Sequence, residues 1–239
     1  EKLSNAVDAD RALLSFDKFL SLLPAGVQLF SLFHTNRQLI DLFIDIICSS
    51  DALSEYLSGN VQVLDAVIDG TFWSEWPGMN VIRKDLAKTL SRENDYESQL
   101  NASRRWGREW HFRIGVHLLR GVITPEMAGF QYGELALATL KELWSLVSSQ
   151  FSKKYGLPPG RGAVLLGLGS LGTKRLHPKS DLDLILIYDP AGVEVSLGKK
   201  EIYSRTYYAR LTKAMVAAIS APMTEMSLFQ VDMRLRPSG

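Results

Sequence analysis

Two aspartates separated by a single residue give the clearest chemical signal in the sequence. Asp181 and Asp183 belong to segment 180–188, which reads SDLDLILIY and continues as an apolar run. Side chains alternate across a β-strand, so both carboxylates are expected on the same face. Two carboxylates this close repel each other, and an apolar strand beside them removes solvation from both charged forms. Because Mg²⁺ takes oxygen ligands and is shared between carboxylates and substrate phosphates, the pair predicts a magnesium site.

A third acid stands on a later segment with the same alternation. Segment 231–236 reads VDMRLR, which puts Asp232, Arg234 and Arg236 on one face of an expected strand and the apolar residues on the other. A carboxylate beside two guanidiniums suits a site that holds both a metal ion and a polyphosphate. We therefore expect Asp232 to join Asp181 and Asp183.

A glycine-rich turn precedes the acids. Residues 167–172 read GLGSLG and follow an apolar run at 163–168 that we interpret as a buried strand. Glycines at such a point let backbone N–H groups approach an anion closely. The turn is neither a Walker A loop nor a dinucleotide fingerprint, because no Lys-Ser/Thr pair follows and the third glycine comes too early. Alone it is most often plain turn chemistry, and only its combination with the acids indicates a phosphate loop.

The elements that must position these groups follow from hydrophobic spacing. The first half reads as helical, with a helix at 12–23, a further apolar segment at 27–33, and helices at 37–47, from Asp51, and at 61–68. Mixed charges at 83–113 indicate one long amphipathic helix with a solvated face; an RNA-binding face is the alternative, because Arg104, Arg105 and Arg108 cluster partially. Thr124 and Pro125 predict the start of a helix that runs to about Phe151. Strands are expected at 163–168, 182–188 and 230–235, with a helix at 199–220.

Composition limits the classes of protein that remain. The chain has 239 residues, is 46% hydrophobic and 22% charged, and carries a net charge of +1, so its overall charge gives no reason to expect nucleic acid or a membrane surface. The one cysteine, Cys48, excludes an intrachain disulfide and is expected to be buried. No apolar stretch reaches the roughly 18 residues of a membrane span, which favours a cytoplasmic setting. Three histidines are expected to be structural because none has a partner at metal-ligand spacing, namely His34, His111 and His117. The missing initial Met indicates a piece of a longer chain.

The combination of motifs resembles a known superfamily. Gly169-Ser170, ten intervening residues, the pair Asp181 and Asp183, and a later strand with one acid form the pattern of polymerase-beta-like nucleotidyltransferases. Within that superfamily the sequence resembles the glutamate–ammonia-ligase adenylyltransferase family, which modifies glutamine synthetase. The similar segments are 167–172, 180–189 and 231–239, together with 23–30, 63–66 and 118–124 in the helical part.

The resemblance implies an α+β fold. A helical region at 1–122 would precede a polymerase-beta-like nucleotidyltransferase domain at 123–239, which has a small mixed sheet flanked by helices. The family continues with a further helical region, which is absent after Gly239. The resemblance assigns catalysis and the binding of the cofactor Mg²⁺ to Asp181, Asp183 and Asp232. It assigns nucleotide binding to Gly169, Ser170, Gly172, Ser180, Arg234 and Arg236.

The resemblance also implies a reaction. Members of the family carry two related halves: the N-terminal half removes AMP from glutamine synthetase by phosphorolysis, and the C-terminal half adds AMP from ATP. Segments 184–189 and 236–239 resemble the adenylylating half, which implies Mg²⁺-dependent transfer of AMP from ATP to a tyrosine of glutamine synthetase in the regulation of nitrogen assimilation. The implied partners are glutamine synthetase, ATP and a PII-type signal protein, with no nucleic acid and no membrane. The deadenylylating half and a non-catalytic nucleotide-sensing module stay open as alternatives.

Three positions in the turn depart from the family pattern. The family usually has lysine, glycine and glutamate where this chain has Ser170, Thr173 and Arg175. Ser170 restores the Gly-Ser of the superfamily. A branched residue where glycine is usual predicts backbone strain at Thr173 if the backbone there has a positive φ.

Overall fold

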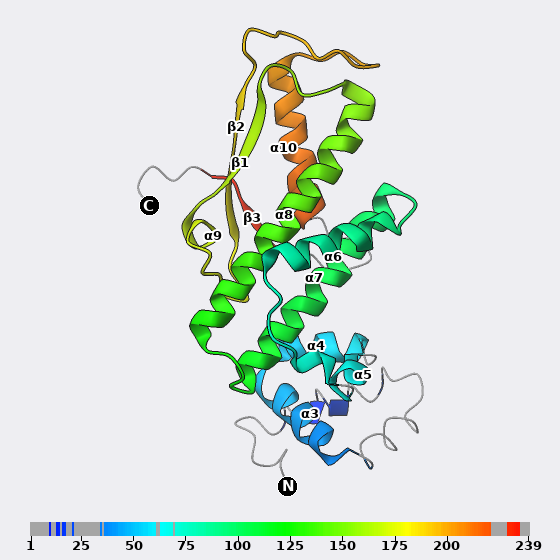
Figure 1. Cartoon of the computed structure of the whole chain (residues 1–239), viewed down its shortest axis with the longest axis vertical. Helices are drawn as coiled ribbons and strands as arrows, with labels where there is room; N and C mark the ends of the chain where they lie inside the picture. The colour runs from blue at the N-terminus through cyan, green and yellow to red at the C-terminus, as the bar shows by residue number, and fades with distance from the viewer. Residues whose placement is uncertain are drawn as a thin grey trace. The chain divides into compact units, whose positions relative to one another are not determined.

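The structure is a computed structural model. It describes residues 10, 13–14, 16–17, 21, 34, 36–60, 63–68, 70–220 and 229–234. The chain divides into two compact units: unit 1 comprises Glu1–Trp76 and Phe112–Pro125, and unit 2 comprises Pro77–His111 and Glu126–Gly239 (Figure 1). Packing thus groups residues 77–111 with those after 126, while the domain division at residue 122 stays a prediction.

Unit 1 is built from short helices around an apolar core. It contains α3 (Arg37–Ser49), α4 (Asp51–Gly59), α5 (Val63–Ile68), the 3-10 turn η2 (Thr71–Trp73) and the end of α7 (Tyr96–Leu119). The expected apolar face of α3 is confirmed, because all five of its members are buried: Leu39, Leu42, Phe43, Ile46 and Ile47. Ser50 caps α4 by accepting a hydrogen bond from the N–H of Leu53 at 3.4 Å. The expected helix at 12–23 and the apolar segment at 27–33 lie largely or wholly outside the described residues.

The histidine and the cysteine of unit 1 have structural surroundings. His117 is buried, its Nε2 lies 2.8 Å from the carbonyl oxygen of Phe72, and its ring stacks on Trp73 with 5.4 Å between centroids. Cys48 is half-buried rather than fully buried and packs against the core of unit 1. Burial raises the pKa of its thiol, with the negative charge of Asp45 as a further cause.

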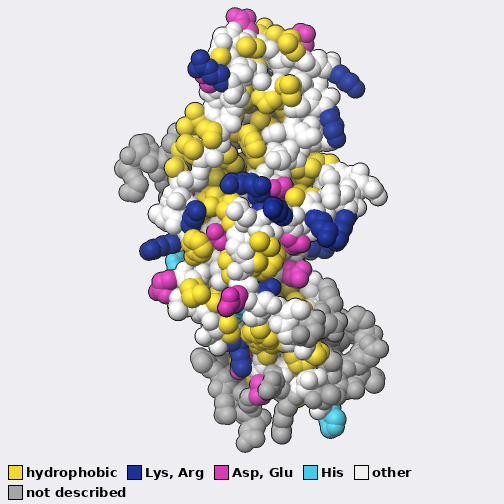
Figure 2. Space-filling model, in the orientation of Figure 1, with side chains coloured by type: hydrophobic (Ala, Val, Ile, Leu, Met, Phe, Trp, Pro, Cys, Tyr) yellow, Lys and Arg dark blue, Asp and Glu magenta, His cyan; other side chains and the backbone are white. Residues whose placement is uncertain are grey.

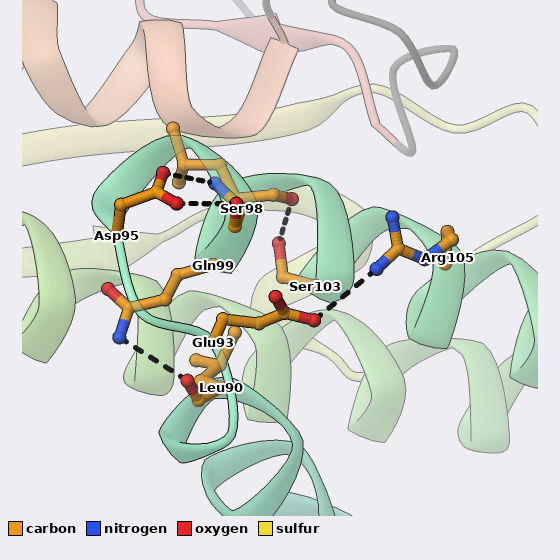
Figure 3. Close-up of polar contacts among 8 residues, drawn as sticks. Leu90, Glu93, Asp95, Ser98, Gln99, Ser103 and Arg105 are labelled. Carbon is orange, nitrogen blue, oxygen red and sulfur yellow. Dashed lines mark hydrogen bonds and ion pairs between the residues drawn. The ribbon is translucent and has the colours of Figure 1, made fainter.

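The single long helix expected at 83–113 is wrong, because the segment forms two helices. α6 (Met79–Ser91) ends before Asp95, and α7 starts at Tyr96. Asp95 caps α7 by accepting bonds from the N–H of Ser98 at 2.9 Å and from its hydroxyl at 2.7 Å. The Gln99 side chain bonds the carbonyl of Leu90 at the end of α6, as Figure 3 shows. A side chain that accepts hydrogen bonds from the first N–H groups of a helix stabilises the start of that helix. The cap at Asp95 therefore favours two helices over one continuous helix.

The arginines that could have formed an RNA-binding face have different environments. Arg104 is only 2% exposed and donates from Nη2 to the carbonyl of Ala218 at 3.0 Å, so it is a core residue. Arg105 pairs with Glu93 at 3.5 Å. The arginines therefore do not form one exposed face, which favours the solvated-helix interpretation over an RNA-binding face.

Two long helices support the sheet of unit 2. α8 (Pro125–Tyr155) starts at the expected proline, and α10 (Ser204–Ser220) starts later than expected because Val195 and Tyr203 form a β-bridge before it. α6 is joined to α7 by the indole of Trp106, which donates to Asp85 at 2.7 Å, and to α8 by the pair of Arg83 and Glu142 at 3.3 Å.

No described helix is both long and apolar enough to cross a membrane.

The sheet has three strands and is mixed. β1 (Gly162–Gly167) pairs antiparallel with β2 (Leu182–Asp189), and β2 pairs parallel with β3 (Val231–Asp232). The α+β expectation is confirmed. Within the described residues β3 is shorter than the expected strand at 230–235.

One face of the sheet is buried, and the other is exposed. Leu182 and Leu184 are buried, and the Tyr188 ring on the same face stacks on Tyr208 of α10 at 4.3 Å. The other face is open: Val164 and Ile187 are partners in the ladder and are 51% and 52% exposed. Hydrophobic side chains are visible at the surface over β1 and β2 in Figure 2. Asp183 lies on this open face, four positions before Ile187.

Candidate active site

Two of the three predicted acids are aligned on neighbouring strands. Asp183 of β2 is the register partner of Asp232 of β3. Directly paired residues project to the same face of a sheet, so both carboxylates belong to the open face. Asp181 stands two positions before Asp183, and both are exposed, whereas the Asp232 side chain is only 12% exposed. The alternation of the sequence predicted a common face for Asp181 and Asp183, and the register of β2 and β3 adds Asp232 to the face of Asp183.

The glycine turn lies against Asp183. Residues Gly169–Gly172 form the single turn α9, and Leu168 joins it to β2 by donating its N–H to the carbonyl of Asp183 at 2.9 Å. Gly169 has a φ of +52°, in the left-handed region that favours glycine. A Cβ at this position would lie 2.6 Å from Oδ2 of Asp183, closer than real contacts allow. Glycine is therefore needed here for both the backbone angle and the approach of the carboxylate.

The turn offers backbone donors at its start. The first N–H groups of a helical turn have no acceptor within the turn, which applies to Gly169, Ser170 and Leu171. The N–H of Gly172 differs, because it donates to the carbonyl of Leu168 at 2.9 Å. The N–H groups of Gly169 and Ser170 are thus available for the nucleotide binding predicted there, whereas the N–H of Gly172 is already used; all three roles stay predictions.

The predicted strain at Thr173 is wrong. Thr173 has an ordinary helical φ of −86°, and its hydroxyl donates to the carbonyl of Ser170 at 3.1 Å. The positive φ occurs one residue later, at Lys174, where it is +55°. A threonine therefore suits position 173, and the departure from glycine does not distort the turn.

The loop from Lys174 to Ser180 leads into Asp181 and is held by contacts with α7 and α8. A Cβ on Gly133 of α8 would lie 2.8 Å from the backbone carbonyl of Lys174, and Leu176 donates its N–H to the carbonyl of Gly129 at 3.1 Å. His111 of α7 places Nε2 3.1 Å from the carbonyl oxygen of Pro178. These supports do not follow from the motifs around the acids, although glycines four residues apart in a helix indicate a close backbone approach.

His111 is fixed in turn by its neighbours. Its ring lies 4.6 Å from the ring of Tyr132, whose hydroxyl donates to the carbonyl of His111 at 3.4 Å. Burial is the largest effect on His111 and lowers the pKa of its imidazole, opposed by the hydrogen bond to Pro178 and assisted by the positive charge of Arg108. The structural role that the sequence predicted for His111 is confirmed.

The remaining predicted nucleotide-binding residues have different environments. The hydroxyl of Ser180 accepts a bond from the N–H of His177 at 2.9 Å, which closes the turn before Asp181. Arg234 curls back onto Asp232: Nε lies 2.9 Å from Oδ1, and Nη2 lies 2.7 Å from Oδ2. Its backbone N–H also donates to Oδ1 at 2.9 Å, which ends β3. Arg236 lies outside the described residues.

The carboxylates fit a magnesium ion by their chemistry, though not as a ready-made cage. In the described parts of the chain, no group of three His, Cys, Asp or Glu side chains is placed to hold a metal ion. The hydrogen bonds that the Arg234 guanidinium donates to the Asp232 carboxylate are the main cause that raises the pKa of Arg234, followed by the charges of Asp232 and Asp181. Oxygen donors on adjacent strands are the ligands that Mg²⁺ prefers. A site of all three acids therefore requires Arg234 to release Asp232.

A small mixed sheet packed on helices, with a glycine turn beside paired acids, defines a nucleotidyltransferase-like α+β domain. The model of one family, described as glutamate-ammonia ligase adenylyltransferase, matches residues 40–239. The chain belongs to this family.

Individual relatives agree with the family assignment. A protein of Brucella melitensis is 38% identical over 232 residues, and one of Agrobacterium fabrum is 39% identical over 232 residues; each alignment covers 97% of this chain and 24% of the relative. A protein of Rhodopseudomonas palustris is 34% identical over 240 residues and is covered to 24%. All three are called bifunctional glutamine synthetase adenylyltransferase/adenylyl-removing enzyme. The chain spans about a quarter of the length of these relatives.

Proposed function

We propose that this chain carries a Mg²⁺-dependent site that transfers AMP from ATP to a tyrosine of glutamine synthetase. The observation that carries the proposal is the alignment of Asp183 with Asp232, beside a glycine turn that has free N–H donors. The names of the relatives support glutamine synthetase as the substrate. A cytoplasmic setting and regulation through a PII-type signal protein belong to the same proposal.

Each group of residues would have its own role in the transfer. Asp181, Asp183 and Asp232 would hold Mg²⁺, which when bound supplies positive charge to the attacking and leaving oxygens. The N–H groups of Gly169 and Ser170 would orient the β- and γ-phosphates, which is a positioning role. Asp232 would also accept the proton of the attacking hydroxyl. The pair formed by Arg234 and Asp232 would open, so that the guanidinium could bind phosphate oxygens.

The transfer would form one bond and break another at the α-phosphorus of ATP. The tyrosine oxygen forms a bond to the α-phosphorus of ATP, the bond from that phosphorus to the bridging oxygen breaks, and pyrophosphate leaves with the electron pair. The hydroxyl proton passes to Asp232.

A matched pair of variants tests the site. Asp181→Asn with Asp183→Asn should abolish Mg²⁺-dependent ATP binding, measured by calorimetry, while the circular dichroism spectrum stays unchanged. Asp189→Asn is the control, because Asp189 is an exposed carboxylate at the far end of the same strand. Equal Mg²⁺-ATP affinities in the double variant and the control would refute the proposal, as would a wild-type chain that does not bind Mg²⁺-ATP.

A second candidate is the adenylyl-removing reaction, in which phosphate takes AMP from the tyrosine oxygen and forms ADP while the oxygen regains a proton. The relatives' names join adenylyltransferase and adenylyl-removing activities, and this chain covers only 24% of each relative. ATP labelled at the α-phosphate distinguishes the two reactions, because only adenylyl transfer moves the label onto glutamine synthetase. Release of ADP from adenylylated glutamine synthetase with phosphate alone would identify the removing reaction instead.

A further inference from the structure

A cavity lies near the C-terminal end of α8. It has a volume of about 440 Å³ and an apolar wall made of Tyr96, Val147, Phe151 and Tyr155. This volume falls within the roughly 300–1,000 Å³ typical of small-molecule sites. The loop before Asp181 packs on α8 at Gly129 and Gly133, whereas the cavity begins at Val147, about 21 Å further along the helix at 1.5 Å per residue. The cavity is therefore separate from the acid-bearing strands.

The charged residues around this cavity are all cationic. Lys153, Lys154 and Lys199 contribute to its lining, which contains no aspartate or glutamate. Arg210 adds a fourth cation, since its Nη1 donates to the hydroxyl of Tyr155 at 3.4 Å. Across the residues that the structure describes, none of these four cations has a carboxylate within ion-pair distance. Like charges that gather without an acid repel one another, and a bound anion would remove that repulsion.

Two of these cations converge on one aromatic ring. Nζ of Lys154 lies 5.3 Å and Cζ of Arg210 lies 5.9 Å from the ring centroid of Tyr155. Burial by itself would raise the pKa of the Tyr155 hydroxyl, but the hydrogen bonds and positive charges of Arg210 and Lys154 outweigh it and lower the pKa. Both cations thus lie where they would also attract the anionic group of a ligand near this ring.

The aromatic wall of the cavity is held in place by packing. The Phe151 ring lies 4.5 Å from that of Tyr155 and 4.9 Å, edge to face, from that of Tyr207. The hydroxyl of Tyr207 donates to the carbonyl of Gly156 at 3.0 Å. Lys200 donates its N–H to the carbonyl of Lys154 at 3.1 Å, which fixes the backbone beside Lys199. A wall of fixed rings with a cationic rim is preorganised for one kind of ligand.

We propose that this cavity binds a small organic anion with a flat, apolar portion. The flat portion would pack against Phe151, and its carboxylate, sulfonate or phosphate would lie among Lys154, Lys199 and Arg210. Aromatic carboxylates and nucleoside monophosphates share this chemistry. The proposal is independent of the reaction assigned to the acid-bearing strands.

An aromatic sulfonate is a suitable probe. 8-Anilinonaphthalene-1-sulfonate should bind the chain at one site, measured by fluorescence titration, and its neutral analogue N-phenyl-1-naphthylamine should bind at least about tenfold more weakly. Lys154→Met with Lys199→Met should weaken sulfonate binding about tenfold or more. Lys84→Met with Lys88→Met is the matched control, because it removes two lysines of α6 that do not line the cavity, and it should leave binding unchanged. Equal affinity in both double variants, or equal binding of the neutral analogue, would overturn the proposal.

Competition identifies the source of the anion. Displacement of the sulfonate by phenylpyruvate supports an aromatic carboxylate, and displacement by AMP supports a nucleotide. Because AMP could also bind at the acids, its displacement must persist in the variant Asp181→Asn with Asp183→Asn. Failure of both competitors to displace the sulfonate would overturn the proposal.

Discussion

Replacing Gly169 by alanine adds a methyl group at the point where the glycine turn meets Asp183. The backbone φ of +52° costs a residue with a Cβ about 1–2 kcal/mol. The same Cβ would stand 2.6 Å from Oδ2 of Asp183, so the carboxylate has to rotate away. The substitution therefore combines a loss of stability with a displaced Asp183 carboxylate, which is a metal ligand in the proposed function.

A control separates these two effects. Gly192 has a φ of +80°, and a Cβ there would meet no atom within 4 Å, so Gly192→Ala adds backbone strain alone. Both variants should lose about 1–2 kcal/mol, which lowers the melting temperature by roughly 2–8 °C for a chain of this size. Only Gly169→Ala should also weaken Mg²⁺-dependent ATP binding, by about tenfold or more, which corresponds to at least about 1.4 kcal/mol.

Calorimetry with Mg²⁺-ATP and thermal unfolding measure the two effects in the same samples. The expected result is similar melting temperatures with different affinities. If Gly169→Ala binds Mg²⁺-ATP as tightly as Gly192→Ala does, the position of the Asp183 carboxylate against the turn does not matter to the nucleotide, and the reasoning is refuted.

Other predictions follow from the loop before Asp181 and from its support. Thr173→Gly should destabilise the chain by about 0.5–1 kcal/mol in urea unfolding, because the native φ of −86° needs no glycine; a gain would restore the strain hypothesis. Lys174→Gly should stabilise it by up to about 1 kcal/mol, since it relieves a φ of +55°, and an unchanged midpoint would contradict this. Gly133→Ala should cost about 1–3 kcal/mol, because its Cβ would meet the Lys174 backbone at 2.8 Å; wild-type stability would exclude that contact. Burial lowers the pKa of His111, so its contribution to stability is complete above the unfolded value of about 6.5 and is lost as the pH falls towards the lowered pKa. Stability measured from pH 7 to pH 5 should fall less steeply in His111→Gln, and parallel curves would count against this role.

Hydrophobic spacing was sufficient for most of the elements. The face of α3, the start of α8 at Pro125 and the run of β2 depend on local patterns, and the structure has each of them. The common face of Asp183 and Asp232 also follows from alternation, once the two strands are adjacent. Spacing failed at Asp95, where the local cap outweighs a helical pattern that continues through it.

The position of the positive φ could not be predicted from the sequence. The family pattern pointed to Thr173, yet the left-handed residue is Lys174, whose backbone is pressed against Gly133 of a helix about 40 residues earlier. That contact, and the bond from His111 to Pro178, join segments that are distant in the chain. Tertiary packing of this kind decides a loop conformation that short-range rules cannot assign.

The contact of Arg234 with Asp232 links the predicted metal ligand to the arginine that we propose binds phosphate. Two contacts from Nε, one from Nη2 and one from the backbone N–H reach the carboxylate of Asp232. A carboxylate has about four lone-pair positions, and three N–H donors of Arg234 occupy most of them, because the two contacts of Nε share one hydrogen. A metal ion at Asp232 would therefore compete with the guanidinium for the carboxylate oxygens. A nucleotide that brings both a metal ion and phosphate oxygens would satisfy both groups at once under the proposed function, because the cation would replace Arg234 at Asp232 while the phosphate would receive Arg234. This exchange explains why a carboxylate and an arginine two residues apart suit a metal-nucleotide site better than either residue alone.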